Sequence, residues 1–392
     1  MENTTRTIYL DYGAATPLDF RVREAMEPYG DDLFFNPSAA YDEARRVRSD
    51  IEGARASIAH LMGARAGNVV FTAGATEANN LAFAAISPDA HAVSDAIEHE
   101  SVLACLDGRP HTVVGVASDG RVDPRGIASA ITPQTELVSV SLANGEIGTV
   151  QPIREIAQAV AAERERRLAA GEMRQIRLHT DASQAATALS VNVSSLGVDM
   201  MTISAAKMYG PKQVGLLWAA DGIALRPLVA GGGQERGIRS GTENVAGIIG
   251  FARAFEIAAA ERTAEAKRLA KLRDRLSRTL VSAFPEAVVS GPRNPKLRLP
   301  GLLHISFPGI EARRLVLRLG RAGVLAATGS ACAASKMRIS HVLTAIGMDE
   351  RTAAGSLRMT LGRFTTEDDI DRAASIIIET VRSEYGRVGG LS

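Results

Sequence analysis

The pattern of apolar and polar positions predicts alternating strands and helices through the first 250 residues. Short apolar runs typical of strands occur at 136–143, 176–182, 199–206 and 214–220. Between and before them, 21–30, 38–63 and 153–172 carry apolar residues at helical spacing. Strands that alternate with helices pair in parallel through crossover helices, so the pattern predicts an α/β fold with a mostly parallel sheet.

The pattern changes after about residue 251. A long helical stretch at 251–284 leads to a proline-rich connection, and a strand and two helices follow, at 302–309, 311–323 and 366–386. A chain of 392 residues exceeds what one compact core usually holds. We therefore expect a large α/β domain over 14–254 and a smaller α+β domain built from 1–13 and 255–392.

Composition and charge narrow the classes of partner. Lys and Arg number 45 against 44 Asp and Glu, which leaves a net charge of +1 and does not favour direct nucleic-acid binding. No apolar run approaches the roughly 20 residues that span a bilayer. The first residues, MENTTRTIYLDYG, lack the basic and apolar regions of a signal peptide. We expect a cytoplasmic protein without a membrane partner.

The two cysteines have different surroundings. Cys105 lies among apolar neighbours in SVLACLDG, which is typical of a small buried hydrophobe. Cys332 lies in AATGSACAASK, a run of small residues followed by Lys336 and Arg338. Small residues without helical period predict an accessible loop, and nearby positive charge favours the reactive thiolate.

Polar residues follow two successive predicted strands. Asp181 comes at the end of one strand, and Lys207 follows the next directly. A carboxylate there either pairs with a protonated ring nitrogen of a cofactor or caps a helix. A lysine among small apolar neighbours is suited to Schiff-base chemistry. Lys212 is the competing candidate, but it follows the turn rather than the strand.

Three further segments carry anion-binding chemistry. The glycine and small residues before Ala75 and Thr76 open a helix, where backbone N–H groups bind phosphate or where the helix is simply capped. The segment 231–247 begins with three consecutive glycines and contains two arginines, and it is either an anion-binding loop or a surface loop. Arg358, on an apolar strand, needs an anionic partner, either a structural carboxylate or a substrate carboxylate.

Taken together, these segments closely resemble the cysteine desulfurases, the NifS/IscS-like branch of the class V aminotransferases. The resemblance covers nearly the whole chain, in the order YLDYGAATPLD, NPS, TAGATEANN, IEHESVL, NGEIGTVQPI, TDASQA, SAAKMYGPK, GGGQERGIRSGT, GSACAAS and LRMTLGRFT. It implies the fold-type I architecture of enzymes that use pyridoxal 5′-phosphate (PLP), and a homodimer with active sites near the subunit interface.

The resemblance also implies a role for each matching residue. Lys207 binds PLP covalently, and Asp181 pairs with its ring nitrogen. Gln184 bonds the ring hydroxyl, and His99 stacks on the ring and assists proton transfer. Substrate binding falls to Arg358 and Asn144, and Cys332 accepts sulfur from L-cysteine as a persulfide. No metal is expected, and the sulfur goes to an acceptor protein or iron–sulfur scaffold. The phosphate site consists of Ala75, Thr76, Ser204 and, from the partner subunit, Thr242.

Three departures from the family pattern bear on the pocket. Ala206 stands where a histidine usually precedes the lysine, Gly145 stands where the family has asparagine, and NPS is followed by AAYDEA without a histidine. Each lost hydrogen bond costs about 0.5–1.5 kcal/mol, which predicts weaker PLP retention or altered substrate choice. A selenocysteine lyase or another PLP-dependent C–S lyase, and a weakly active homologue that acts as a scaffold, remain alternatives.

Overall fold

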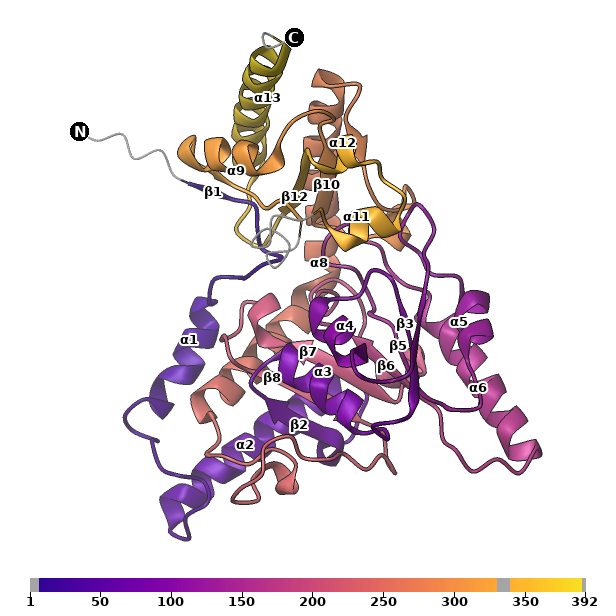
Figure 1. The fold of residues 1–392 in the computed structure, drawn as a ribbon. Helices are drawn as coiled ribbons and strands as arrows, with labels where there is room; N and C mark the ends of the chain where they lie inside the picture. Colours follow the sequence, from indigo (N-terminus) through magenta and orange to yellow (C-terminus); the bar gives the residue numbers. More distant parts are fainter. Residues whose placement is uncertain (1–6, 330–338, 390–392) are drawn as a thin grey trace.

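A 39-residue helix, α8 (Val245–Ala283), connects two unequal halves of the molecule (Figure 1). The computed structural model describes residues 7–329 and 339–389. The larger half surrounds a seven-stranded sheet and the smaller half a three-stranded sheet. The early turns of α8 bury Phe251 and Phe255 in the larger half, whereas Leu272 and Leu276 belong to the core of the smaller half.

The large sheet is parallel except for one strand. Its spatial order is β2-β8-β7-β6-β5-β3-β4, and only β8 runs opposite to its neighbours. Between β7 and β8 lie residues 205–214, too few for a crossover helix, so these two strands pair antiparallel. The mostly parallel sheet predicted from the sequence is confirmed. The strands are β2 (Val69–Thr72), β3 (His91–Asp95), β4 (His111–Val114), β5 (Thr135–Ser139), β6 (Arg177–Asp181), β7 (Met200–Ser204) and β8 (Gly215–Ala219).

Both faces of this sheet are covered, because successive apolar residues along its strands point to opposite sides. Phe71, Val138 and Met201 pack on one face against α2, α6 and α8. Their neighbours in sequence, among them Val70, Leu137 and Met200, pack on the other face against α3 and α4. The helices of this half besides α8 are α1 (Phe20–Met26), α2 (Asp42–Leu61), α3 (Ala75–Ala84), α4 (Glu100–Leu106), α5 (Pro124–Ala130), α6 (Ile153–Ala169) and α7 (Val193–Leu196).

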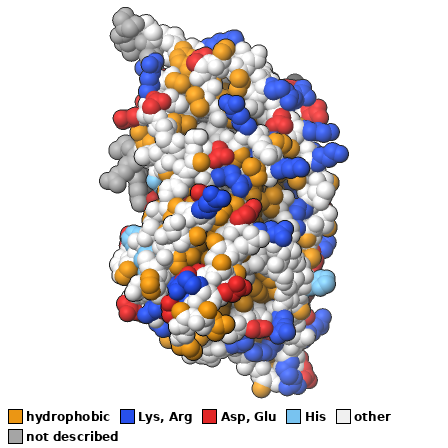
Figure 2. All heavy atoms as spheres, turned by 90° about the vertical axis from the view of Figure 1, so that its right-hand side faces the viewer, with side chains coloured by type: hydrophobic (Ala, Val, Ile, Leu, Met, Phe, Trp, Pro, Cys, Tyr) orange, Lys and Arg blue, Asp and Glu red, His pale blue; other side chains and the backbone are white. Residues whose placement is uncertain are grey.

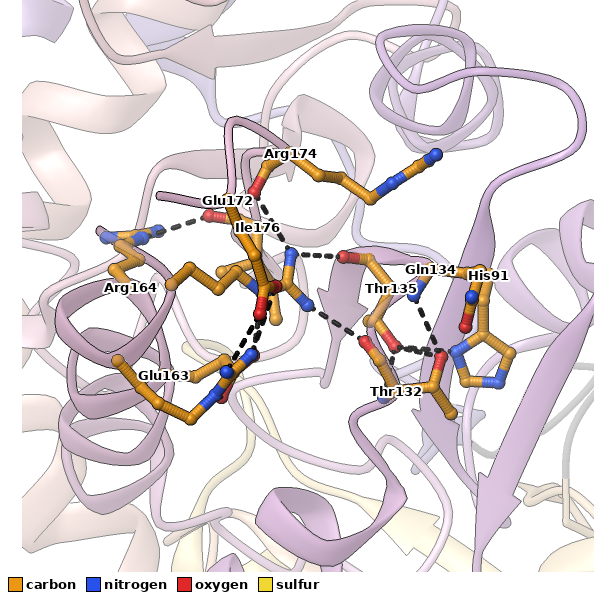
Figure 3. A network of polar contacts seen from close by, with 11 residues as sticks. His91, Thr132, Gln134, Thr135, Glu163, Arg164, Glu172, Arg174 and Ile176 are labelled. Atoms are coloured by element: carbon orange, nitrogen blue, oxygen red, sulfur yellow. Dashed lines mark hydrogen bonds and ion pairs between the residues drawn. The ribbon is translucent and has the colours of Figure 1, made fainter. Parts of the chain in front are cut away.

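The end of α6 is fastened to the sheet by a buried arginine. Arg167, only 2% exposed, donates to Glu163 Oε1 at 2.6 Å and to the carbonyl oxygens of Thr135, Thr132 and Arg174 at 2.9–3.1 Å. Figure 3 shows these carbonyl groups around one point between helix and strand. Hydrogen bonds from Arg166 and Arg167 lower the pKa of Glu163 to about 2. We call this set the Arg167 anchor.

The smaller half has its own sheet and core. β10 (Leu302–Ser306) pairs antiparallel with β9 (Val288–Val289) and with β12 (Ser356–Thr360), and β1 (Ile8–Tyr9) pairs parallel with β11 (Val324–Leu325). The helices are α9 (Ala312–Arg321), α11 (His341–Ala345), α12 (Glu350–Ala353) and α13 (Glu367–Gly389). Ile8 and Leu10 belong to this core, which is separate from the core of the larger half. The domain bounds 14–254, and 1–13 with 255–392, stay a prediction.

The surface carries mixed charge. On the face turned to the viewer in Figure 2, positive and negative side chains alternate, as the net charge of +1 suggests. Within the described residues, every helix is either too short or too polar to cross a membrane.

Candidate active site

A cavity of about 730 Å³ opens where β3, β5, β6 and β7 end. In open α/β sheets ligands bind at this edge. Most of the residues singled out from the sequence line it, although they come from both halves of the molecule: Ala75, Thr76, His99, Asn144, Asp181, Gln184, Ser204, Lys207 and Arg358. Cys332 lies outside the described residues, and Thr242 is not among the described residues that line the cavity.

Lys207 reaches the cavity from a short helical turn, Ala205–Lys207, that follows β7. Its Nζ donates to the carbonyl oxygens of Gly13 at 3.0 Å and Ala14 at 2.6 Å. The chain then turns sharply, with Tyr209 in the left-handed region at φ 63°. Lys212 also lines the cavity, and its Nζ donates to Thr16 O at 2.8 Å. Both lysines are therefore present, and the choice of Lys207 stays a prediction.

Asp181 ends β6 and is held by groups that donate to it. Its Oδ1 accepts from the N–H of Ser183, and its Oδ2 accepts from Asn79 Nδ2, each at 2.9 Å. Two residues earlier, His179 is fully buried between Ser139 and Thr202, and burial lowers its pKa to about 4. His179 is therefore neutral, and the carboxylate at the end of β6 is that of Asp181.

A hydrogen-bonded chain joins Asp181 to His99. Asn79, fully buried on α3, donates to both Asp181 and the Ser101 hydroxyl. Ser101 in turn contacts His99 Nδ1 through its Oγ at 2.8 Å and through its N–H at 3.1 Å. Because the backbone N–H is a donor, neutral His99 carries its proton on Nε2. Sequence reasoning missed Asn79 and Ser101, although both lie within the quoted motifs TAGATEANN and IEHESVL.

The N-terminus of α3 is the place where the sequence predicts a phosphate site. Its N-cap, Gly74, has φ 123°, a conformation that strongly favours glycine. Ala75 and Thr76 open the helix, where unpaired N–H groups and the helix dipole favour an anion. Ser204, 7% exposed, lies on the cavity wall at the end of β7. Glu77 Oε2 accepts from Ala73 N at 2.7 Å, so this carboxylate stabilises the loop that precedes α3.

Arg358 enters the cavity from β12 in the smaller half. It is 4% exposed, and its Nη2 contacts Asp11 Oδ1 at 2.7 Å. Nη1 makes only a long bond of 3.3 Å to Gly145 O, and Nε has no hydrogen-bond partner. This arginine has a structural carboxylate partner, and it also retains donor capacity for a second anion.

Asn144 and Gly145 show how one departure from the family pattern is accommodated. The Asn144 amide is engaged by the backbone, since it donates to Ile97 O and accepts from the N–H groups of Glu146 and Ile147. The Asn144 Nδ2 carries a second proton besides the one donated to Ile97 O, and Asn144 lines the cavity, so substrate binding by Asn144 would fall to that donor. A Cβ on Gly145 would meet the Gln184 side chain at 2.9 Å. In this chain Gln184 therefore fills space that an asparagine side chain at 145 would need.

Two buried carboxylates, Asp95 and Glu98, precede His99 in the chain. Burial raises the pKa of Asp95 to about 7, and burial together with the Asp95 charge raises the pKa of Glu98 well above its ordinary value. Glu98 lines the cavity and accepts from the N–H and hydroxyl of Ser141. Its carbonyl oxygen contacts His341 Nε2 at 3.0 Å. These carboxylates could not be singled out from the sequence, because neither their burial nor their proximity is visible in it.

A family model matches most of this chain and shows which protein family it belongs to. The model described as aminotransferase class-V matches residues 8–373. The chain belongs to the class-V aminotransferase family. The same comparison confirms the family resemblance drawn from the motifs.

Individual members of this family are similar over nearly their full length. A protein of Dictyoglomus turgidum named cysteine desulfurase IscS is 40% identical over 391 residues, covering 96% of each chain. The solved structure of a NifS-like protein has a TM-score of 0.87 at 32% identity and covers 96% of this chain and 100% of its own. A structure titled SspA in complex with cysteine has a TM-score of 0.76 at 32% identity, covering 92% of this chain and all of that one. Class-V members of this kind share the fold-type I architecture seen here.

Proposed function

We propose that this protein is a PLP-dependent cysteine desulfurase that converts L-cysteine to L-alanine and passes the sulfur to Cys332. The observation that carries the proposal is the convergence of Lys207, Asp181 and Arg358 on one cavity. These residues come from two different strand ends of the large sheet and from the small sheet. They supply an amine, a carboxylate and a guanidinium, the three groups needed to hold PLP and an amino-acid carboxylate.

The residues present fit PLP. The cavity is large enough for a cofactor with substrate, and Asp181 supplies an anionic partner for a protonated ring nitrogen. Ala75, Thr76 and Ser204 form a corner suited to the phosphate group, and Lys207 is placed for covalent attachment. Gln184 and His99 complete the set as groups near the ring. When bound, PLP withdraws electrons from the substrate Cα, which makes its proton acidic.

The residues of the chain then have separate tasks. Arg358 binds the substrate carboxylate with the donors that Asp11 and Gly145 leave unused. The Lys207 amine accepts the proton from the substrate Cα and returns it during product formation. The His99 imidazole, with its proton on Nε2, serves as a second group for proton transfer at the substrate thiol.

Sulfur transfer requires a nucleophile on the protein. The Cys332 thiolate attacks the substrate sulfur, a new S–S bond forms, and the substrate Cβ–S bond breaks with its electron pair remaining on Cβ. Cβ then takes a proton and becomes the methyl group of alanine. The persulfide on Cys332 is the form in which sulfur passes to an acceptor protein, in iron–sulfur cluster assembly or in thio-modification of a cofactor or nucleic acid.

A homodimer is part of this proposal. Thr242 is exposed and is not among the described residues that line the cavity of its own subunit, which is compatible with a role at the phosphate site of a partner. Large apolar side chains are exposed around α1, the start of α2 and the segment before the 231–242 loop, namely Phe20, Phe34, Tyr41, Leu228 and Val229. Phe34 and Tyr41 both contact the Phe35 ring and so form one apolar cluster, and an exposed apolar cluster favours a protein interface. We propose the cytoplasm as the compartment, in keeping with a reactive thiol.

The decisive experiment measures alanine and sulfide from L-cysteine with PLP and a reductant. The wild type is expected to make equal amounts of both, and Lys207→Ala and Cys332→Ala are each expected to make neither. Cys105→Ala is the matched control, because burial raises the pKa of Cys105 to about 11 and its Sγ donates to Ser101 O. Sulfide release by Cys332→Ala would show a C–S lyase instead. A wild type that binds no PLP and makes no product would refute the proposal.

A further inference from the structure

The loop that carries Thr242 is fastened to its own subunit by a buried ion pair. Glu235, whose side chain is 4% exposed, accepts two hydrogen bonds of 2.7 Å from the Arg55 guanidinium on α2. Its Oε2 also accepts from Phe71 N on β2 at 2.8 Å. Buried charges are retained when they are paired and bonded in this way. The Arg55 guanidinium also lies over the Phe71 ring, 4.7 Å from its centre.

The backbone around Glu235 adopts an unfavourable conformation. Glu235 and Arg236 both have positive φ, 47° and 59°, although neither is glycine. Such residues cost free energy and persist only where surrounding contacts impose the conformation. The bidentate pair with Arg55 is the strongest contact made by this part of the loop. Without it, the left-handed turn would lose its main support.

The rest of the loop is bonded to this turn. Gln234 Oε1 accepts from Gly241 N at 2.9 Å, and Ser240 Oγ accepts from Gly233 N. Arg239 donates to Glu77 on α3 at 3.1 Å. Glu235 is therefore the buried base of a cross-linked loop whose other end presents Thr242, an exposed residue.

We propose that Glu235 is a positioning residue for the phosphate site of the partner subunit. This inference rests on the proposed function, in which Thr242 reaches the cofactor of the partner. Glu235 fixes the position from which Thr242 extends, so its loss weakens PLP binding in the other subunit. The effect on its own subunit is small, because Phe71 stays held by β2 pairing with β8 at Leu216, and Glu77 stays bonded to Ala73 N even if Arg239 moves.

The first measurement is PLP titration of the apo-protein, followed by the visible absorbance of Lys207-bound cofactor. Glu235→Gln is expected to weaken PLP binding about tenfold, the equivalent of one hydrogen bond to a charged group. Glu235→Asp, which keeps the charge, is expected to restore part of this loss. Glu384→Gln is the matched control, because Glu384 is also fully buried and pairs with Arg314, Arg318 and Arg387 in the smaller half. It is expected to lower the melting temperature without changing PLP affinity.

Mixed dimers separate action across the interface from a local effect. In each mixed dimer, one subunit carries Lys207→Ala, so only the other subunit contributes the absorbance of Lys207-bound cofactor. With Glu235→Gln placed in the Lys207→Ala subunit, the intact site receives its loop from the altered subunit, and PLP binding is expected to be weak. With Glu235→Gln placed in the subunit that keeps Lys207, binding is expected to match a dimer with both Glu235 residues intact.

Three outcomes would overturn the proposal. They are PLP binding that is weak only in the second mixed dimer, PLP binding that is equally weak in both, and PLP binding that is normal in both. Equal loss of affinity in Glu384→Gln would also overturn it, since the effect would then be general destabilisation. A control dimer with both Glu235 residues that binds no PLP would refute the proposed function, and this inference with it. If the control dimer binds PLP normally and the two mixed dimers depart from the expected pattern, only the positioning role of Glu235 is refuted.

Discussion

Two arginines, both nearly inaccessible to solvent, are used differently in this molecule. Arg167, 2% exposed, uses Nε and both terminal nitrogens in bonds of 2.6–3.1 Å to one carboxylate and three carbonyl groups. Arg358, 4% exposed, makes one short bond to Asp11 and one of 3.3 Å to Gly145 O. Nearly all hydrogen-bond donors of the Arg167 guanidinium are therefore used, whereas Arg358 has unused donors beside the cavity.

The difference separates a structural polar group from a binding one. An arginine whose donors are all engaged has nothing left to offer a ligand, and its removal leaves several buried acceptors without partners. An arginine with unused donors beside a cavity can bind an anion. Asp95 shows the same incompleteness, since its Oδ2 is buried without a hydrogen-bond partner and its pKa is raised.

The largest expected effect is on the Arg167 anchor. Arg167→Met should lower the free energy of unfolding by about 4 kcal/mol, because one partner of a buried, bonded pair is lost. Urea denaturation followed by circular dichroism measures this change. Arg166→Met is the matched control, since the Arg166 side chain is 49% exposed. It should cost less than about 1 kcal/mol. Equal urea midpoints for the two variants would contradict a structural role for burial of Arg167.

An intermediate effect is expected at Arg358. Arg358→Ala should lower kcat/KM for L-cysteine by about 100-fold, because charge-assisted bonds to the substrate carboxylate are lost. Steady-state alanine production measures it. With the methyl ester of L-cysteine, which lacks the negative charge, the ratio between wild type and variant should shrink markedly. The same ratio for both substrates would mean that Arg358 acts only through Asp11.

The smallest effect concerns Asp95. Its folded pKa of about 7 lies above the ordinary 3.8, so the folded chain binds this proton more tightly than the unfolded chain. Stability from this group is therefore complete below about pH 4 and is lost as pH rises toward 7. Asp95→Asn removes this dependence and should raise stability at pH 8 relative to the wild type by about 1 kcal/mol. The substitution also removes the Asp95 charge, which is one of the causes that raise the pKa of Glu98.

Melting temperatures at pH 5 and pH 8 test this prediction. The difference between wild type and Asp95→Asn should be larger at pH 8 than at pH 5. A gap that is larger at pH 5 would show that Asp95 is ionised and favourable in the folded protein.

Much of the architecture was readable from periodicity. The predicted strand at 176–182 appears as Arg177–Asp181, and the predicted helix at 153–172 appears as Ile153–Ala169. The strand predicted at 136–143 ends earlier, at Ser139. The chain beyond it is still apolar but turns at Asn144, whose side chain bonds to the backbone and ends any extended run. Val140 N and Leu142 N still donate to β6, at His179 O and Asp181 O, so apolar character alone does not show where a regular strand ends.

The sequence by itself determined the kind of fold and the chemical groups of the site, because strand ends in an α/β sheet meet at one edge. Lys207, Asp181 and Ala75 follow from that rule. Only the tertiary structure decided which polar groups are already used. Asn144 is engaged by the backbone, Gln184 fills the space beside Gly145, and Glu235 pairs with Arg55 across 180 residues. These outcomes depend on which distant residues become neighbours, and no local pattern in a single sequence records that.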